Sequence, residues 1–172
     1  VVDYLEKLVT PYPKWKYWKQ LGGMFGAQER MTDQLVAYEV IYLNGELTKE
    51  SDVLAMAYMY LGAEVPYRAA KIIEKGIKDK IVEKNFKHYD LLGKSWFLAQ
   101  HIPQALSSYE TASKYSDNGE IQYLIGSTYL DLGQDMMAYK ASLKAEKKGG
   151  IKKPNANYAT MGNALLNMHC YK

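Results

Sequence analysis

The sequence predicts an all-α fold, an α-α superhelix in which about nine to ten helices form antiparallel hairpins stacked into a solenoid. Its main signal is a small residue that recurs at intervals of 35, 36, 33 and 36 residues, namely Gly22, Ala57, Gly93, Gly126 and Gly162. A bulky apolar residue follows each of them three positions later: Phe25, Tyr60, Trp96, Tyr129 and Leu165. A period near 34 residues is typical of stacked helix hairpins.

The composition supports a folded chain and excludes two classes of function. The 172 residues are 48% hydrophobic and 24% charged, which is typical of a folded domain rather than a disordered one. The net charge of +3 is too small to predict nucleic-acid binding without a clustered basic stripe. The sequence has no run of about 18 apolar residues, so it predicts no membrane span.

The repeat divides the chain into units over 15–49, 50–85, 86–118 and 119–154, with a partial unit over 155–172. We treat 1–172 as a single repeat array in which residues 1–12 end a preceding helix. The chain starts without Met and stops after the first helix of the last unit. We therefore expect a fragment of a longer protein, with a removed signal peptide or a missing anchor as open alternatives.

Each unit is expected to contain two helices. In the third unit the first helix runs over about 87–99, because Tyr89, Leu92, Gly93 and Trp96 follow helical spacing. Pro103 and Pro66 suit the first turn of a second helix, where a missing N–H costs nothing. Asp135 is predicted to be the N-cap of the second helix in the fourth unit. The connections over 76–85 and 149–154 are expected to be longer turns between hairpins.

The small residues have a predicted packing role. Small side chains let two helix axes approach closely within their usual separation of about 8–10 Å. Ala69, Ala105 and Ala138 stand twelve residues after Ala57, Gly93 and Gly126. An isolated helical Gly costs about 1 kcal/mol relative to Ala, so its recurrence indicates that close contact offsets the cost.

These residues resemble the tetratricopeptide repeat (TPR), whose pattern is an aromatic or Leu, then Leu-Gly, Tyr, Gly, Ala, Tyr and Ala. The fourth unit matches at Ile125-Gly126, Tyr129, Gly133, Ala138 and Ala145. The first unit matches less well, since Gln34 takes the place of the first Ala. The resemblance covers nearly the whole chain. It implies a non-catalytic scaffold that binds a peptide or partner protein.

Several phrases resemble a narrower group, the bacterial TPR proteins encoded beside TonB, ExbB and ExbD. They are residues 17–21 (YWKQL), 66–71 (PYRAAK) and 143–145 (LKA) followed by Lys153-Pro154. This resemblance implies a periplasmic accessory of a TonB-type transport complex, with TonB, ExbB or ExbD components as partners. A cytoplasmic location is the alternative.

A partner is expected in a concave groove lined by the first helix of each unit, at positions 2, 5, 9 and 12 of the unit. These positions hold Lys16, Lys19, Gly23, Gly26, Ser51, Leu54, Tyr58, Leu61, Lys87, Asp90, Lys94, Phe97, Glu120, Tyr123, Ser127, Leu130, Ala156, Ala159, Asn163 and Leu166. We name seven of them the groove candidates: Lys16, Lys19, Tyr58, Lys94, Tyr123, Ser127 and Asn163. Aromatic anchors and lysines together favour a peptide of some acidic character. Phe97, Leu61, Leu130 and Leu166 are instead expected to pack against neighbouring hairpins.

No catalytic, metal or cofactor site is predicted. His88, His101 and His169 are far apart, and no His-Glu-x-x-His motif occurs. Gly93-Lys94-Ser95 resembles the end of a phosphate loop but lies within a predicted helix. Cys170 has no nearby base in the sequence and is treated as ordinary.

A second hypothesis is a self-assembling structural subunit. The partial last unit motivates it, because a first helix without its hairpin partner exposes an apolar face. Self-association would then run through the terminal repeat.

Overall fold

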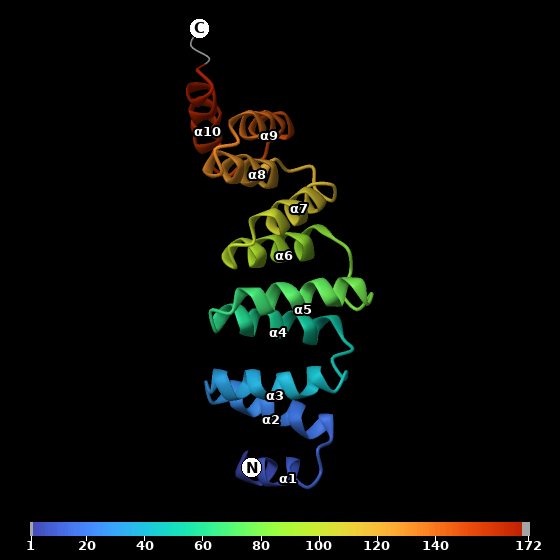
Figure 1. The fold of residues 1–172 in the computed structure, drawn as a ribbon. Helices are drawn as coiled ribbons and strands as arrows, with labels where there is room; N and C mark the ends of the chain where they lie inside the picture. The colour runs from blue at the N-terminus through green and yellow to red at the C-terminus, as the bar shows by residue number, and fades with distance from the viewer. Residues whose placement is uncertain (1, 170–172) are drawn as a thin grey trace. The chain divides into compact units, whose positions relative to one another are not determined.

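The computed structural model describes residues 2–169, and every regular element in that range is a helix. The chain divides into two compact units, an N-terminal unit (Val1–Glu83) and a C-terminal unit (Lys84–Lys172). The predicted all-α fold of helix hairpins is confirmed (Figure 1). The continuous array over 1–172 and its unit boundaries stay predictions.

The N-terminal unit holds two hairpins and a leading helix. Its helices are α1 (Val2–Val9), α2 (Trp15–Ala27), α3 (Met31–Leu43), α4 (Glu50–Gly62) and α5 (Pro66–Lys78). Helix α2 pairs with α3 and α4 with α5, while α1 packs on α2 and α3 contacts α4 (Figure 1). Leu5 and Val9 of α1 join Leu21 and Phe25 of α2 in one buried cluster.

The C-terminal unit holds two hairpins and a last helix that follows them. Its helices are α6 (Phe86–Leu98), α7 (Ile102–Ala112), α8 (Glu120–Asp131), α9 (Asp135–Lys148) and α10 (Pro154–Asn167). Helix α6 pairs with α7 and α8 with α9, and α7 contacts α8. Helix α10 packs against both α8 and α9 (Figure 1).

The same type of turn connects the two helices in each of the four hairpins. Its central residue has a positive φ: 59° at Glu29, 58° at Glu64, 61° at Gln100 and 68° at Gly133. The next backbone N–H donates to the carbonyl five residues earlier, as from Arg30 to Phe25 at 2.9 Å and from Gln134 to Tyr129 at 2.8 Å. This hydrogen bond is typical of the Schellman motif that ends helices. The reversal of the chain is therefore built into the backbone at the same place in each hairpin.

The predicted close contact between the two helices of a hairpin is confirmed in the C-terminal unit. A Cβ added to Gly93 would lie 2.5 Å from the ring of Tyr109, and one added to Gly126 would lie 2.5 Å from Oγ of Ser142. The facing alanines, Ala105 and Ala138, are fully buried. Substituting these glycines would therefore force the two helices or their side chains apart.

The predicted packing role is wrong for Gly162. A Cβ added to this residue would meet no neighbouring atom within 4 Å. The reason is that α10 contacts α8 and α9, and no second helix of its own hairpin lies among the described residues.

In the first hairpin a different pair of residues forms the close contact between the two helices. Gln34 stands where the other second helices carry Ala, and its amide lies against Gly26, whose added Cβ would be 2.5 Å from Nε2. Gly26 was expected in the groove, but this contact places it against α3. The longer side chain on one helix is thus accommodated by glycine on the other.

Two expectations about helix ends are wrong. Asp135 is the first residue of α9 rather than its N-cap, which is Gln134 and makes no side-chain cap bond. The Asp135 carboxylate instead accepts a hydrogen bond from Nδ2 of Asn167 at 2.8 Å. Gly76 lies inside α5 and not in the following connection, and a Cβ added to it would lie 2.7 Å from Cγ2 of Val82.

Other helix starts agree with the sequence. The prolines Pro66, Pro103 and Pro154 stand in the first turns of α5, α7 and α10, as their missing N–H favours. Asn85 adds a cap that we did not predict, since its Oδ1 accepts from the backbone N–H of His88 at 3.0 Å.

Replacing Gly93 and Gly162 by Ala should have opposite effects, although both stand at the same place in the repeat. Gly93→Ala should lower the free energy of unfolding by about 1–3 kcal/mol, because the added methyl overlaps the buried Tyr109 ring. Gly162→Ala should raise it by up to about 1 kcal/mol through helix propensity alone. Urea denaturation followed by circular dichroism measures both, and equal effects would contradict the contact described here.

Candidate functional site

The seven groove candidates belong to two different compact units. Lys16, Lys19 and Tyr58 lie in the N-terminal unit, on α2 and α4. Lys94, Tyr123, Ser127 and Asn163 lie in the C-terminal unit, on α6, α8 and α10. Each set is described within its own unit.

Lys19 joins two neighbouring first helices. Its Nζ, on α2, lies 2.6 Å from Oδ2 of Asp52 on α4, and the Asp52 side chain is only 18% exposed. Tyr38 lies near this pair: burial raises the pKa of its phenol, the Asp52 carboxylate raises it further, and Lys19 lowers it. Lys19 is therefore engaged in an ion pair and offers little uncompensated charge to a partner.

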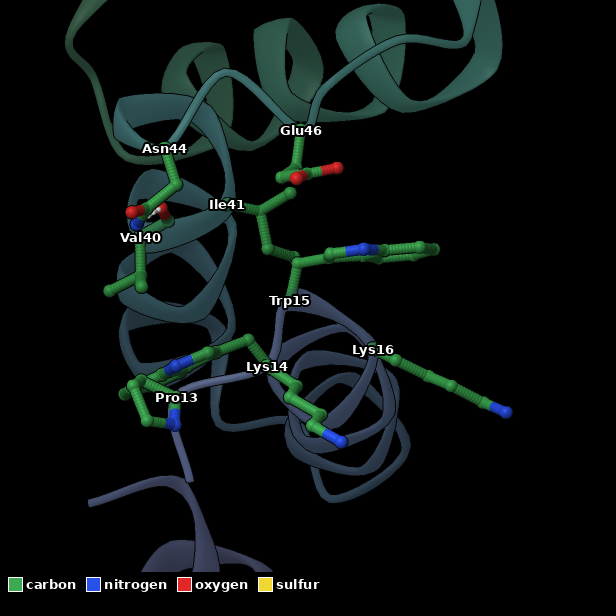
Figure 2. Close-up of a pocket in the computed structure, with 9 residues that line it drawn as sticks. Pro13, Lys14, Trp15, Lys16, Val40, Ile41, Asn44 and Glu46 are labelled. Carbon is green, nitrogen blue, oxygen red and sulfur yellow. Dashed lines mark hydrogen bonds between the residues drawn. The ribbon is translucent and has the colours of Figure 1, made fainter. Parts of the chain in front are cut away.

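Lys16 lies beside a cavity at the start of α2. The cavity has a volume of about 410 Å³ and is lined by Pro13, Trp15, Ile41 and Glu46 among others. Figure 2 shows the Lys16 side chain extending away from Val40 and Asn44 on the opposite wall. Lys16 is exposed, so its charge is available at the edge of this cavity.

Tyr58 is the groove candidate best placed to hold an apolar side chain. It is 59% exposed and borders a cavity of about 450 Å³ between α3 and α4. Met31 and Leu35 line the cavity from α3, while Ala55 and Met59 line it from α4. An aromatic ring at the rim of an apolar cavity can cover a bound side chain with a large contact area.

The four candidates of the C-terminal unit are spread over three helices. Lys94 forms an ion pair with Asp90 one turn earlier on α6. Tyr123 and Ser127 are half-buried on α8, and the Ser127 hydroxyl donates to the Leu124 carbonyl at 3.5 Å. Asn163 is exposed on α10, a helix that contacts α8.

The expected packing of four apolar groove residues holds only in part. Leu61 and Leu130 are half-buried, as expected. Phe97 is 38% exposed and Leu166 is 54% exposed, so the packing interpretation is wrong for both residues. For Leu166 the reason is that α10 contacts α8 and α9, and no second helix of its own hairpin lies among residues 2–169.

The structure also contains a cavity that we did not predict, on the second-helix side of the N-terminal unit. It has a volume of about 360 Å³ and is lined by residues of α3, α4 and α5. The Tyr60 hydroxyl donates to Oε1 of Glu39 at 2.9 Å, and Nη1 of Arg68 donates to the same oxygen at 2.6 Å. The Arg68 guanidinium also lies over the Tyr60 ring, 5.9 Å from its centre. The three residues come from three helices, so only the fold could reveal the cluster.

A second cavity of this kind lies in the C-terminal unit, among α7, α8 and α9. Its volume is about 570 Å³, and Glu110, Tyr129 and Met137 are among its lining residues. The Tyr129 hydroxyl donates to Oε1 of Glu110 at 3.4 Å. The periodicity of the repeat could have suggested this pair, because it repeats the pair formed by Tyr60 and Glu39.

No protein-family model matches the sequence, and no curated protein matches it. Solved structures do. A MamA protein is 18% identical, with 90% of this chain and 82% of that chain covered and a TM-score of 0.68. YrrB, described as a TPR protein with an unusual peptide-binding site, is 12% identical, with coverages of 98% and 86% and a TM-score of 0.65. The MamA protein of Desulfovibrio magneticus RS-1 is 11% identical, with coverages of 86% and 82% and a TM-score of 0.58.

The chain has the tetratricopeptide-repeat fold. At these identities the likeness establishes the fold and not the partner. None of the three structures connects the chain with TonB, so that part of the resemblance stays a prediction.

The described residues contain no group of three or more His, Cys, Asp and Glu side chains that could hold a metal ion. Within the same range no helix is both long and apolar enough to cross a bilayer. Cys170 lies outside the described residues.

The Tyr60 cluster should make the stability of the protein sensitive to alkaline pH. Burial, together with the hydrogen bond to Glu39, raises the pKa of Tyr60 to about 12. A raised pKa means that the phenol stabilises the fold fully below its ordinary value of about 10, and that this contribution is lost as the pH rises through about 12. We expect Tyr60→Phe to lose less stability than the wild type over this window.

Urea denaturation at several pH values between about 9 and 11.5 tests this expectation. Tyr12→Phe is the matched control, because Tyr12 is 59% exposed and should leave the alkaline slope unchanged. Parallel slopes for Tyr60→Phe and the wild type would contradict the assignment.

Proposed function

We propose that this chain is a non-catalytic interaction module that binds a peptide or partner protein through the groove candidates. The observation that carries the proposal is the exposed Tyr58 ring at the rim of an apolar cavity, on a first helix of a TPR fold. YrrB, which shares the fold, is described as having a peptide-binding site, and this supports the same class of function here.

Binding would combine contact area with weak electrostatic steering. An apolar side chain of the partner would enter the cavity between α3 and α4, where Tyr58 would cover it. Lys16 is exposed on the neighbouring first helix and would attract an acidic peptide. Lys19 and Lys94 contribute less, because Asp52 and Asp90 already compensate their charges.

The finer part of the proposal is an accessory role in a periplasmic, TonB-type transport complex. It is supported by the phrases over 17–21, 66–71 and 143–145 that resemble TPR proteins encoded beside TonB, ExbB and ExbD. A photo-reactive amino acid placed at position 58 should then cross-link to one of these components in cells of the source organism. The same amino acid at position 12 is the control, since Tyr12 is equally exposed but lies outside the cavity. Cross-links to cytoplasmic proteins alone would contradict the periplasmic assignment.

The double substitution Tyr58→Ala plus Tyr123→Ala tests the groove more generally. It should weaken capture of the cross-linked partner at least about tenfold, because truncating aromatic anchors removes most of the binding energy of such surfaces. Tyr12→Ala should leave capture unchanged. Unchanged capture by the double variant, with the fold verified by circular dichroism, would refute binding through the groove candidates.

The alternative function is self-assembly through the last helix. It is favoured by the exposure of α10, where Leu166 is 54% and Tyr158 is 53% exposed. Self-assembly predicts a mass that rises with concentration in light scattering, and a Leu166→Asp variant that stays monomeric. A mass of one chain at every concentration would rule it out.

A further inference from the structure

The two cavities on the second-helix side occupy equivalent places in the repeat. The fourth repeat starts at Gly119, 69 residues after the start of the second at Glu50. Tyr60 therefore corresponds to Tyr129, and Arg68 corresponds to Met137. Glu39 and Glu110 likewise stand at the same place in the first and third repeats, 24 residues after Trp15 and Phe86. The chain thus carries the same cavity twice, with different side chains.

In the C-terminal unit the cavity is lined by residues of the second helices α7 and α9 and of the first helix α8. Glu110 lines it from the last turn of α7, and Ser113 and Lys114 line it from the turn that follows this helix. Met137, Lys140, Ala141 and Lys144 line it from α9, at helical spacing. Ile125 and Tyr129 of α8 lie between them. We call this cavity the trough, and its lining combines apolar side chains with Lys114, Lys140 and Lys144.

In the N-terminal unit the corresponding charges are neutralised within the chain. Arg68 donates to Glu39, as described above. Lys71 lies 2.8 Å from Glu74, and Lys75 pairs with Asp79. These pairs lie three and four residues apart on α5 or at its end, which is the spacing at which opposite charges on a helix meet.

In the C-terminal unit the neutralising side chains are replaced. Lys140 and Lys144 correspond to Lys71 and Lys75 and keep the positive charge. Leu143 takes the place of Glu74, and Lys148 takes the place of Asp79. Lys148 itself turns to the end of α7, where its Nζ donates to the carbonyls of Ser113 and Ser116 at 2.9 and 2.8 Å.

The trough therefore keeps an excess of positive charge. Among residues 2–169, Lys140, Lys144 and Lys114 make no ion pair, and Glu110 is the acidic side chain among the lining residues. Met137 and Leu143, each 45% exposed, add apolar surface beside these lysines. Met in particular adapts its shape to different bound groups.

We propose that this trough between α7 and α9 binds an acidic peptide segment that carries an apolar side chain. The apolar side chain packs against Ile125 and Tyr129, which line the trough, and the peptide carboxylates pair with Lys140 and Lys144. Charge complementarity selects this occupant, since a basic segment would meet three lysines against one glutamate. The surface is separate from the groove candidates on the first helices, so it can exist whether or not they bind a partner.

The test uses a short fluorescent peptide that alternates leucine with glutamate, and the full chain. Fluorescence anisotropy should show saturable binding at low salt that weakens as salt is added. The variant Lys140→Gln plus Lys144→Gln should bind about three- to tenfold more weakly. The variant Lys71→Gln plus Lys75→Gln should bind as the wild type does, because these equivalent lysines are already paired.

A matched peptide with glutamine in place of each glutamate should bind weakly to every variant. Equal loss of affinity in both lysine pairs would show non-specific charge attraction and overturn the proposal. Unchanged binding by the Lys140 and Lys144 variant would also overturn it. So would light scattering that shows dimers of the wild type and monomers of that variant, because a second copy of the chain would then be the occupant. The Tyr58 plus Tyr123 variant should bind this peptide normally, which separates this result from a failure of the groove.

Discussion

Close contact between the two helices of each hairpin is the constraint on which the rest of this protein depends. At Gly93 the ring of Tyr109 fills the space that a side chain would need, and Ala105 beside it is fully buried. Because this face of each helix packs against the other helix of its hairpin, the orientation of the remaining faces is fixed as well. The exposed tyrosine of α4 and the lysines of α9 are outward residues of helices whose inward residues cannot move.

The sequence was sufficient for features that depend on residues near one another in the chain. Helical spacing and the prolines of α5 and α7 predicted the hairpins, because these signals act within a turn or two. The ion pair of Lys19 and Asp52 joins residues 33 positions apart, and nothing in either local pattern indicates it. The packing role predicted for Gly162 is wrong for the same reason, since the space around a helical residue depends on its neighbours in the fold.

The binding surfaces show the same division. Tyr58 could be identified from its place in the repeat, but the methionines that complete its cavity come partly from the preceding hairpin. The cavities on the second-helix side required three helices at once, two from one repeat and one from the repeat before it. The repeat is still useful once the structure is known, because equivalent positions in the two halves of the chain can be compared. A side chain that differs between equivalent cavities then stands out as a candidate for a specific role.

The way in which α5 neutralises its lysines has a consequence for how such a protein can change. Glu74 and Asp79 are exposed acids beside the lysines they serve, and neither belongs to the contact that holds the hairpin together. A few substitutions at such sites change the charge of a cavity without changing the core. Duplicated hairpins can therefore diverge in what they recognise without first diverging in how they fold.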